Sequence, residues 1–83
     1  MITEEELKQI EHRVNSAQPG PRKAYIENRD HESGSNFIMT GTDEQRGNDI
    51  EMDGATIADY DFIANARQDI PRLIDEIRKL RAK

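Results

Sequence analysis

The sequence predicts one small α+β domain, with a helix at each end and a short antiparallel β-meander between them. Apolar residues recur every three or four positions near both ends of the chain, as they do on one face of a helix. Residues 22–57 lack this period, contain four of the five glycines and show short β-prone runs. The length of 83 residues leaves room for one domain, which we expect to span residues 1–83.

The first helix is expected to begin after Thr3. Thr3 followed by Glu6 is a capping box, and Ile2 and Leu7 occupy the two positions that form a hydrophobic staple around such a cap. The Pro-Gly-Pro sequence at 19–21 should end the helix and turn the chain. The apolar stripe of this helix consists of Leu7, Ile10, Val14 and Ala17.

The middle of the chain is expected to form three or four short strands. The β-prone runs lie at 24–26, 36–40, 49–52 and 55–57. The connections at 28–35 and 41–48 are polar, and both contain residue types that tight turns require. We expect these turns at Ser33-Gly34-Ser35 and Arg46-Gly47-Asn48.

A long helix is expected at the C-terminal end, with Asp59 or Asp61 as its N-cap. Pro71 lies inside this helix, lacks an N–H and crowds the carbonyl of Arg67. The helix should therefore kink or restart near Pro71, with Asp69 as a second cap. Its apolar residues have heptad spacing and are named here the seam: Ile63, Ala66, Ile70, Leu73, Ile77 and Leu80.

The seam has two candidate partners. The apolar stripe of the first helix has the same spacing, so the two helices could pack antiparallel within one chain, and we expect such a core face at Ile70 and Leu73. The first helix is the shorter of the two, which leaves the end of the seam without cover from the same chain. Small domains often need an additional source of stability. We therefore expect a homo-oligomer that uses Ile70, Leu73, Ile77 and Leu80.

Composition argues against several classes of protein. The net charge of −5 gives no reason to expect binding to nucleic acid polymers or to anionic membranes. The charge is uneven, because residues 72–83 are basic and residues 43–61 are acidic, which favours attraction between these regions within or between chains. The chain has no cysteine and no apolar run of membrane-spanning length, and its acidic start does not resemble a signal peptide. We expect a cytoplasmic protein.

Neither a metal site nor a catalytic centre is expected. Residues 49–54 match the opening of a calcium-binding loop, but Tyr60 occupies the position where a bidentate Glu should close the site. The simpler interpretation is a half-buried strand with Asp49, Glu51 and Asp53 facing water. Neither His12 nor His31 stands beside a candidate Ser nucleophile with an orienting acid. We therefore expect a protein without catalytic activity, metal or cofactor.

Glycine turns and arginines indicate recognition of a small anion. The turn at 33–36 offers hydroxyls and backbone N–H groups, and the turn at 46–48 carries a guanidinium. Each turn alone is also typical of an ordinary hairpin. Arg22 and Arg67 add positive charge, and Phe37 or Tyr25 offers a surface on which a base could stack. The candidate ligand-binding residues are Arg22, Ser35, Asn36, Phe37, Arg46, Gly47 and Arg67.

The order of these features resembles small proteins carried by tailed bacteriophages and prophages. The most specific stretch is DFIANARQDIPRLIDEI at 61–77, and shorter matches lie at 17–21, 34–38, 46–50 and 54–56. Many relatives have Trp after the Pro-Gly-Pro, where this sequence has Arg22. The resemblance implies a phage accessory protein in the cytoplasm of a host bacterium. Such proteins commonly counter host defence, some of them as oligomeric sponges that sequester nucleotide second messengers.

Two main functional hypotheses follow from the sequence, beside a third, a small hydrolase that would use the acidic strand with a metal. The first is a non-catalytic phage protein that sequesters a small nucleotide-like anion in pockets completed by oligomerisation. The alternative is an interaction module that binds a host protein through the seam. The first requires ordered, convergent donor groups, whereas the second requires an exposed apolar or charged face.

Overall fold

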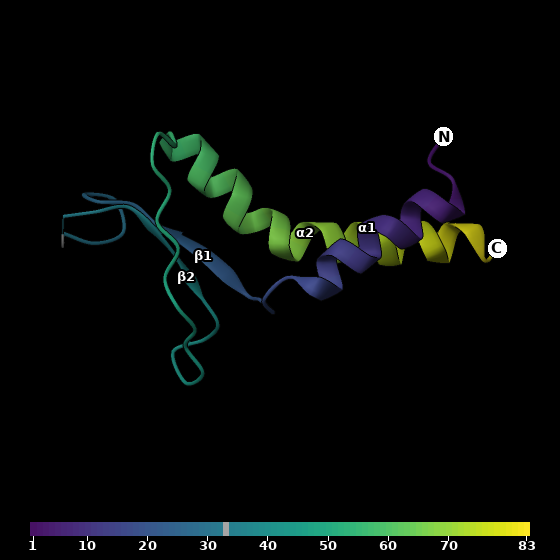
Figure 1. Cartoon of the computed structure of the whole chain (residues 1–83), viewed down its shortest axis with the longest axis horizontal. Coiled ribbons are helices and arrows are strands. Elements are labelled where there is room, and N and C mark those ends of the chain that lie inside the picture. The colour runs from purple at the N-terminus through teal and green to yellow at the C-terminus, as the bar shows by residue number, and fades with distance from the viewer. Residues whose placement is uncertain (33) are drawn as a thin grey trace.

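A computed structural model, which describes residues 1–32 and 34–83, has the element order α1–β1–β2–α2. α1 spans Glu4–Ser16 and α2 spans Ile57–Arg81, while β1 (Arg22–Tyr25) pairs antiparallel with β2 (Phe37–Thr40). The sheet packs beside the first half of α2, and α1 lies along the remainder (Figure 1). Both termini lie at one end of an elongated molecule of 48 × 28 × 20 Å. The predicted α+β class is confirmed.

α1 has the predicted capping box. The Thr3 hydroxyl accepts a hydrogen bond from the Glu6 N–H at 3.1 Å, and the Glu6 carboxylate accepts one from the Thr3 N–H at 3.0 Å. The hydrogen bond from the Thr3 N–H is the main cause that lowers the pKa of the Glu6 carboxyl group. Leu7 is buried, and Ile10 and Val14 further along the stripe are half-buried. The helix ends at Ser16, just before the Pro-Gly-Pro sequence that was expected to end it.

The main core lies between the sheet and the first half of α2. Arg22 stands opposite Thr40 in the sheet, and Tyr25 stands opposite Phe37. Side chains from both strands and from the helix form one buried cluster, partly covered by residues 50–55. The members of this cluster are Ala24, Ile26, Ile38, Tyr60 and Ala64.

The described residues contain two strands, whereas three or four were predicted. Ile50 forms only an isolated bridge with Ile38, through two backbone hydrogen bonds of 2.8 and 2.9 Å. The chain does not continue as a strand because it turns at Gly54, where φ is +77°, and the helix cap begins at Thr56. The predicted strand at 55–57 is therefore wrong. The predicted turn at 33–35 includes Ser33, which lies outside the described residues.

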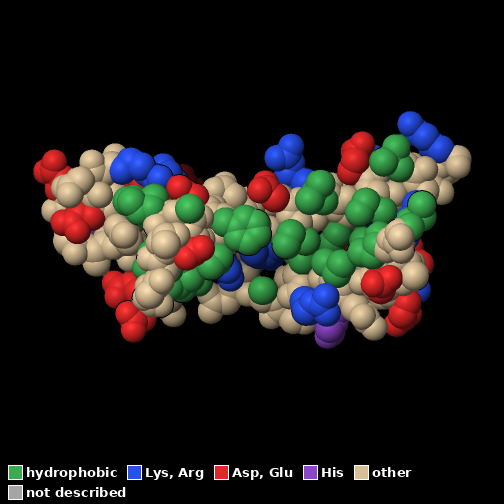
Figure 2. All heavy atoms as spheres, turned by 90° about the horizontal axis from the view of Figure 1, so that it is seen from above, with side chains coloured by type: hydrophobic (Ala, Val, Ile, Leu, Met, Phe, Trp, Pro, Cys, Tyr) green, Lys and Arg blue, Asp and Glu red, His purple; other side chains and the backbone are tan. Residues whose placement is uncertain are grey.

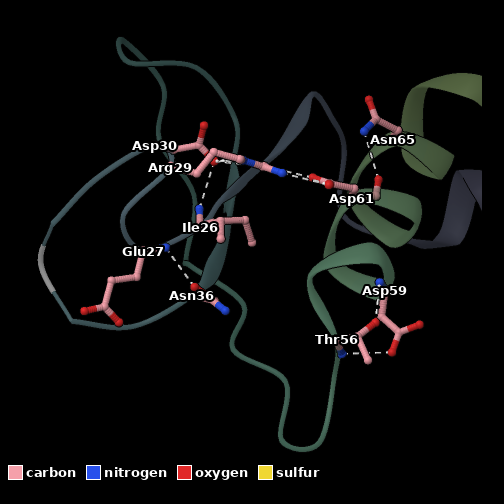
Figure 3. Close-up of polar contacts among 9 residues, drawn as sticks. All are labelled: Ile26, Glu27, Arg29, Asp30, Asn36, Thr56, Asp59, Asp61 and Asn65. Atoms are coloured by element: carbon pink, nitrogen blue, oxygen red, sulfur yellow. Dashed lines mark hydrogen bonds and ion pairs between the residues drawn. The ribbon is translucent and has the colours of Figure 1, made fainter.

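α2 begins earlier than predicted, because Thr56 is its N-cap in place of Asp59 or Asp61. The Thr56 hydroxyl accepts from the Asp59 N–H at 3.1 Å, and the Asp59 carboxylate accepts from the Thr56 N–H at 3.0 Å (Figure 3). Asp61 instead receives two hydrogen bonds from Arg29, at 2.9 and 3.0 Å. This bidentate pair connects the β1–β2 connection to the helix (Figure 3).

α2 continues through Pro71, so the predicted restart with a second cap at Asp69 is wrong. A proline inside a helix removes one backbone hydrogen bond, which interactions of the following turns can offset. Ile74, one turn later, is buried, and Arg78 forms ion pairs with Glu4 and Glu11 of α1 at 2.8 and 3.1 Å. The kink near Pro71 stays a prediction.

The seam is not the face of α2 that the rest of the chain covers. The predicted core face at Ile70 and Leu73 is wrong, because these side chains are 37% and 61% exposed. The buried residues of α2 are Tyr60, Ala64 and Ile74, which lie on the neighbouring face. Successive residues point about 100° apart around a helix, so Ile74 faces the interior while Leu73 does not. Figure 2 shows hydrophobic side chains along the outer face of the helical part.

Candidate anion-binding pocket

Gln68 of α2 fixes the start of β1. Its side-chain oxygen accepts a hydrogen bond from the Arg22 N–H at 2.8 Å, and its side-chain nitrogen donates to the Arg22 carbonyl at 2.9 Å. The amide thus pairs with Arg22 as a neighbouring strand would. Because the backbone is held at this point, the Arg22 side chain starts from a fixed position beside α2.

Arg67 holds the linker between α1 and β1. Its Nε donates to the carbonyl of Gln18 at 2.9 Å. Its aliphatic stem passes Gly20, where an added Cβ would lie 3.2 Å from Cγ of Arg67. Gly20 therefore leaves room for the arginine to cross the linker.

These contacts bound a cavity of about 230 Å³ between α1, β1 and α2, named here the arginine pocket. Its lining is mostly apolar and combines arginine with aliphatic side chains, and part of that lining belongs to the seam. In Figure 2, basic side chains lie between hydrophobic ones near the middle of the face that is drawn. The lining residues are Arg13, Val14, Ala17, Arg22, Ile63, Ala66, Arg67 and Ile70.

The arginines of this pocket differ from most of the other arginines, which form ion pairs with carboxylates. Within residues 1–32 and 34–83, Arg13, Arg22 and Arg67 form no ion pair, and the Nε of Arg22 is buried without a hydrogen-bond partner. A buried donor without a partner costs free energy, which an acceptor entering the pocket would recover. The residues that line the pocket offer donors and apolar surface, but no carboxylate, imidazole or hydroxyl. The arrangement is suited to holding an anion.

Arg46 and Gly47 lie elsewhere, at a cavity of about 440 Å³ between the linker and residues 40–48. The Arg46 guanidinium contacts both carboxylate oxygens of Asp49, at 2.9 and 3.1 Å, and this contact raises the pKa of Arg46. Its charge is therefore already paired. A Cβ at position 47 would lie 2.4 Å from the Thr40 hydroxyl, so Gly47 is explained by the packing of Thr40.

Ser35, Asn36 and Phe37 lie at the opposite end of the sheet. Ser35 and Asn36 line a cavity of about 400 Å³ together with two acidic residues, Glu51 and Asp53. The side-chain oxygen of Asn36 accepts from the Glu27 N–H at 2.8 Å (Figure 3). The ring of Phe37 stacks on that of Tyr25, with centroids 5.3 Å apart and an interplanar angle of 9°. Of the predicted residues, the structure brings Arg22 and Arg67 together in the arginine pocket.

Sequence reasoning missed Arg13. It lies on α1 immediately before Val14, beside the apolar stripe, where an arginine normally points into solvent. Its spacing of four from Ala17 placed both residues on one side of the helix end nearest the Pro-Gly-Pro turn. Arg13 lies shortly before the Pro-Gly-Pro turn and Arg22 directly after it. This placement was the signal in the sequence that the two arginines could lie close together.

Two further searches of the described part of the chain were negative. It contains no group of three or more His, Cys, Asp or Glu residues that could hold a metal ion. Neither of its helices is long and apolar enough to cross a membrane. Comparisons with protein-family models, with curated proteins and with solved structures find no match to this chain.

Proposed function

We propose that the protein is a non-catalytic binding protein that captures a small phosphate-bearing, nucleotide-like anion in the arginine pocket. The observation that carries the proposal is the convergence of Arg13, Arg22 and Arg67 without carboxylate partners among the described residues. Arginine matches phosphate in geometry as well as charge, because its guanidinium can donate two parallel hydrogen bonds. A lining without a nucleophile or a general base supports binding without turnover.

The size of the pocket limits what it can hold. Its volume of about 230 Å³ is below the range of about 300–1,000 Å³ typical of small-molecule sites. A phosphate group would fit inside it, and the remainder of a nucleotide would extend along its edge. Val14 and Ala17, which do not belong to the seam, offer apolar surface for a base at this edge. A second copy on the seam would complete the enclosure of such a ligand.

The resemblance of residues 61–77 to phage proteins supports a specific biological role for such binding. We propose that the chain acts in the cytoplasm of a host bacterium as an anti-defence sponge. A sponge lowers the free concentration of a signalling nucleotide by binding alone, so it needs no catalytic group. An oligomer would offer several pockets of this kind per particle.

The test is binding of inorganic phosphate and a panel of cyclic mono-, di- and trinucleotides, measured by thermal shift and calorimetry. A ligand at 100 times its dissociation constant should stabilise the fold by about 2.7 kcal/mol. Arg67→Gln should weaken binding about 10- to 100-fold, because a charge-assisted hydrogen bond is lost. Arg72→Gln is the matched control, since Arg72 is exposed on the same helix outside the pocket. The proposal fails if no compound binds, or if both variants bind as wild type does.

The alternative function is an interaction module that binds a host protein through the seam. The exposure of Leu73 and Leu80, at 61% and 59%, favours it. The two functions respond to different substitutions. A host-protein module would lose its partner on Leu73→Asp and keep it on Arg67→Gln, whereas the anion-binding protein would lose its ligand on Arg67→Gln.

A further inference from the structure

α2 carries two apolar faces, and the chain covers one of them. Tyr60, Ala64 and Ile74 are buried under the sheet and α1. The seam beside them stays open: Ile63 is 39% exposed, Ile70 37%, Leu73 61% and Leu80 59%. A surface helix of a monomer usually has a single apolar stripe, and a second contiguous one marks an interaction site.

The size of the uncovered surface indicates how large the missing partner is. The chain exposes 6227 Å², whereas a monomer of 9.5 kDa is expected to expose about 5,000 Å². Its radius of gyration is 15.2 Å, against about 12 Å for a compact domain of this length. The excess area is of the order of the 800 Å² that each partner buries in an interface of ordinary size.

We infer that the seam is covered by the seam of a second copy of this chain, with the two α2 helices antiparallel. The spacing of the seam residues along the chain is the same from either end. If two antiparallel helices are related by a two-fold axis between residues 71 and 72, every seam residue therefore lies opposite a seam residue of the partner. The resulting pairs are Ile63 with the partner's Leu80, Ala66 with the partner's Ile77, and Ile70 with the partner's Leu73. No charged residue lies in the seam.

The charges of α2 favour the antiparallel arrangement over the parallel one. Residues 57–70 carry three carboxylates and one arginine, whereas residues 71–83 carry five basic and two acidic residues. Part of the positive charge of residues 71–83 is neutralised by α1, because Arg78 and Arg81 pair with Glu4. Arg72, Lys79 and Lys83 form no ion pair within the described ranges. Antiparallel helices place these cations over the partner's acidic half and also oppose the two helix dipoles.

The first test is the mass of the protein in solution, by light scattering and analytical ultracentrifugation over a range of concentrations. Wild type should have twice the mass of one chain, and Leu73→Asp should raise the dissociation constant about 100-fold or more, because it puts two charges at the centre of the interface. Ile57→Asp is the matched control: Ile57 is 51% exposed on the same helix, but off the seam, so this variant should stay dimeric. A monomeric wild type, or a dimer that survives Leu73→Asp, overturns the inference.

The second test fixes the register by disulfide formation, which the absence of native cysteines makes unambiguous. Antiparallel pairing places Cys side chains from Ile63→Cys chains about 25 Å apart along the axis, beyond the roughly 7 Å that a disulfide allows. Ile63→Cys alone should therefore stay uncrosslinked, and so should Leu80→Cys alone. A mixture of the two variants should give a crosslinked heterodimer under oxidation. Crosslinking of Ile63→Cys by itself would show parallel helices, and no crosslink in the mixture would remove the seam as the interface.

Discussion

Tyr60 joins three segments of the chain through one hydroxyl group. The hydroxyl accepts a hydrogen bond from the Met52 N–H at 3.0 Å and lies 3.1 and 3.2 Å from the carbonyl oxygens of Met52 and Asn36. The residue is 4% exposed, so water cannot readily replace these contacts. The position of residues 50–55 over the core therefore depends on a polar group as well as on apolar packing.

Tyr60→Phe should lower the free energy of unfolding by about 1–3 kcal/mol, because it leaves the Met52 N–H without its partner while preserving the ring. Denaturant unfolding of wild type and variant measures the difference. Tyr25→Phe is the control, since the Tyr25 hydroxyl has no hydrogen bond within the described residues, and it should change stability little. Equal losses in both variants would contradict the role assigned to the Tyr60 hydroxyl.

The connection between β1 and β2 is attached to α2 by charge. Arg29 donates to Asp30 at 2.9 Å and to both carboxylate oxygens of Asp61, and Asp30 also accepts from the Ile26 N–H at 2.9 Å (Figure 3). Hydrogen bonds from Arg29 are the main cause that lowers the pKa of both carboxyl groups and raises that of Arg29. The exposed position of the cluster means that salt will screen it.

The lowered pKa of Asp61 determines how the stability of the fold changes with pH. The contribution of this carboxylate to stability is present above its ordinary pKa of 3.8 and is lost as the pH falls through the lower value of the folded state. The melting temperature of wild type should therefore fall in this acidic range, and Asp61→Asn should reduce that dependence. Asp53→Asn serves as the control, because Asp53 forms no ion pair in the described part of the chain. An unchanged pH profile in Asp61→Asn would count against the ion pair.

The features of the molecule that the sequence predicts best are those decided by neighbouring residues. The cap at Thr3 depends on Glu6 three positions later, and the end of α1 depends on the following Pro-Gly-Pro. The cap at Thr56 is equally local, but the β-prone residues around it and the carboxylates of Asp59 and Asp61 offered competing interpretations. The structure decides between them because Thr56 and Asp59 satisfy each other's N–H groups.

The features that the sequence does not predict depend on how elements far apart in the chain are oriented. The spacing of α2 identifies the seam as apolar, but it does not say which of two neighbouring faces α1 will cover. Likewise, Arg13 and Arg67 are separated by most of the chain, and they meet only because α1 folds back along α2. Arg46 was a reasonable candidate from its turn, yet its pairing with Asp49 became visible only in the structure.

Among the elements that the structure describes, α1 contacts α2 alone. It is attached by Leu7, its one buried residue, and by ion pairs that Arg78 makes with Glu4 and Glu11. The sheet and α1 face each other across the arginine pocket but do not pack together, and α2 is the common support of both. Local opening follows such divisions of a structure. We expect α1 to detach while the sheet remains folded on α2. Hydrogen exchange, measured by mass spectrometry, should therefore be fast in α1 and slow around Ala64. Equal protection of both regions would indicate a single cooperative unit.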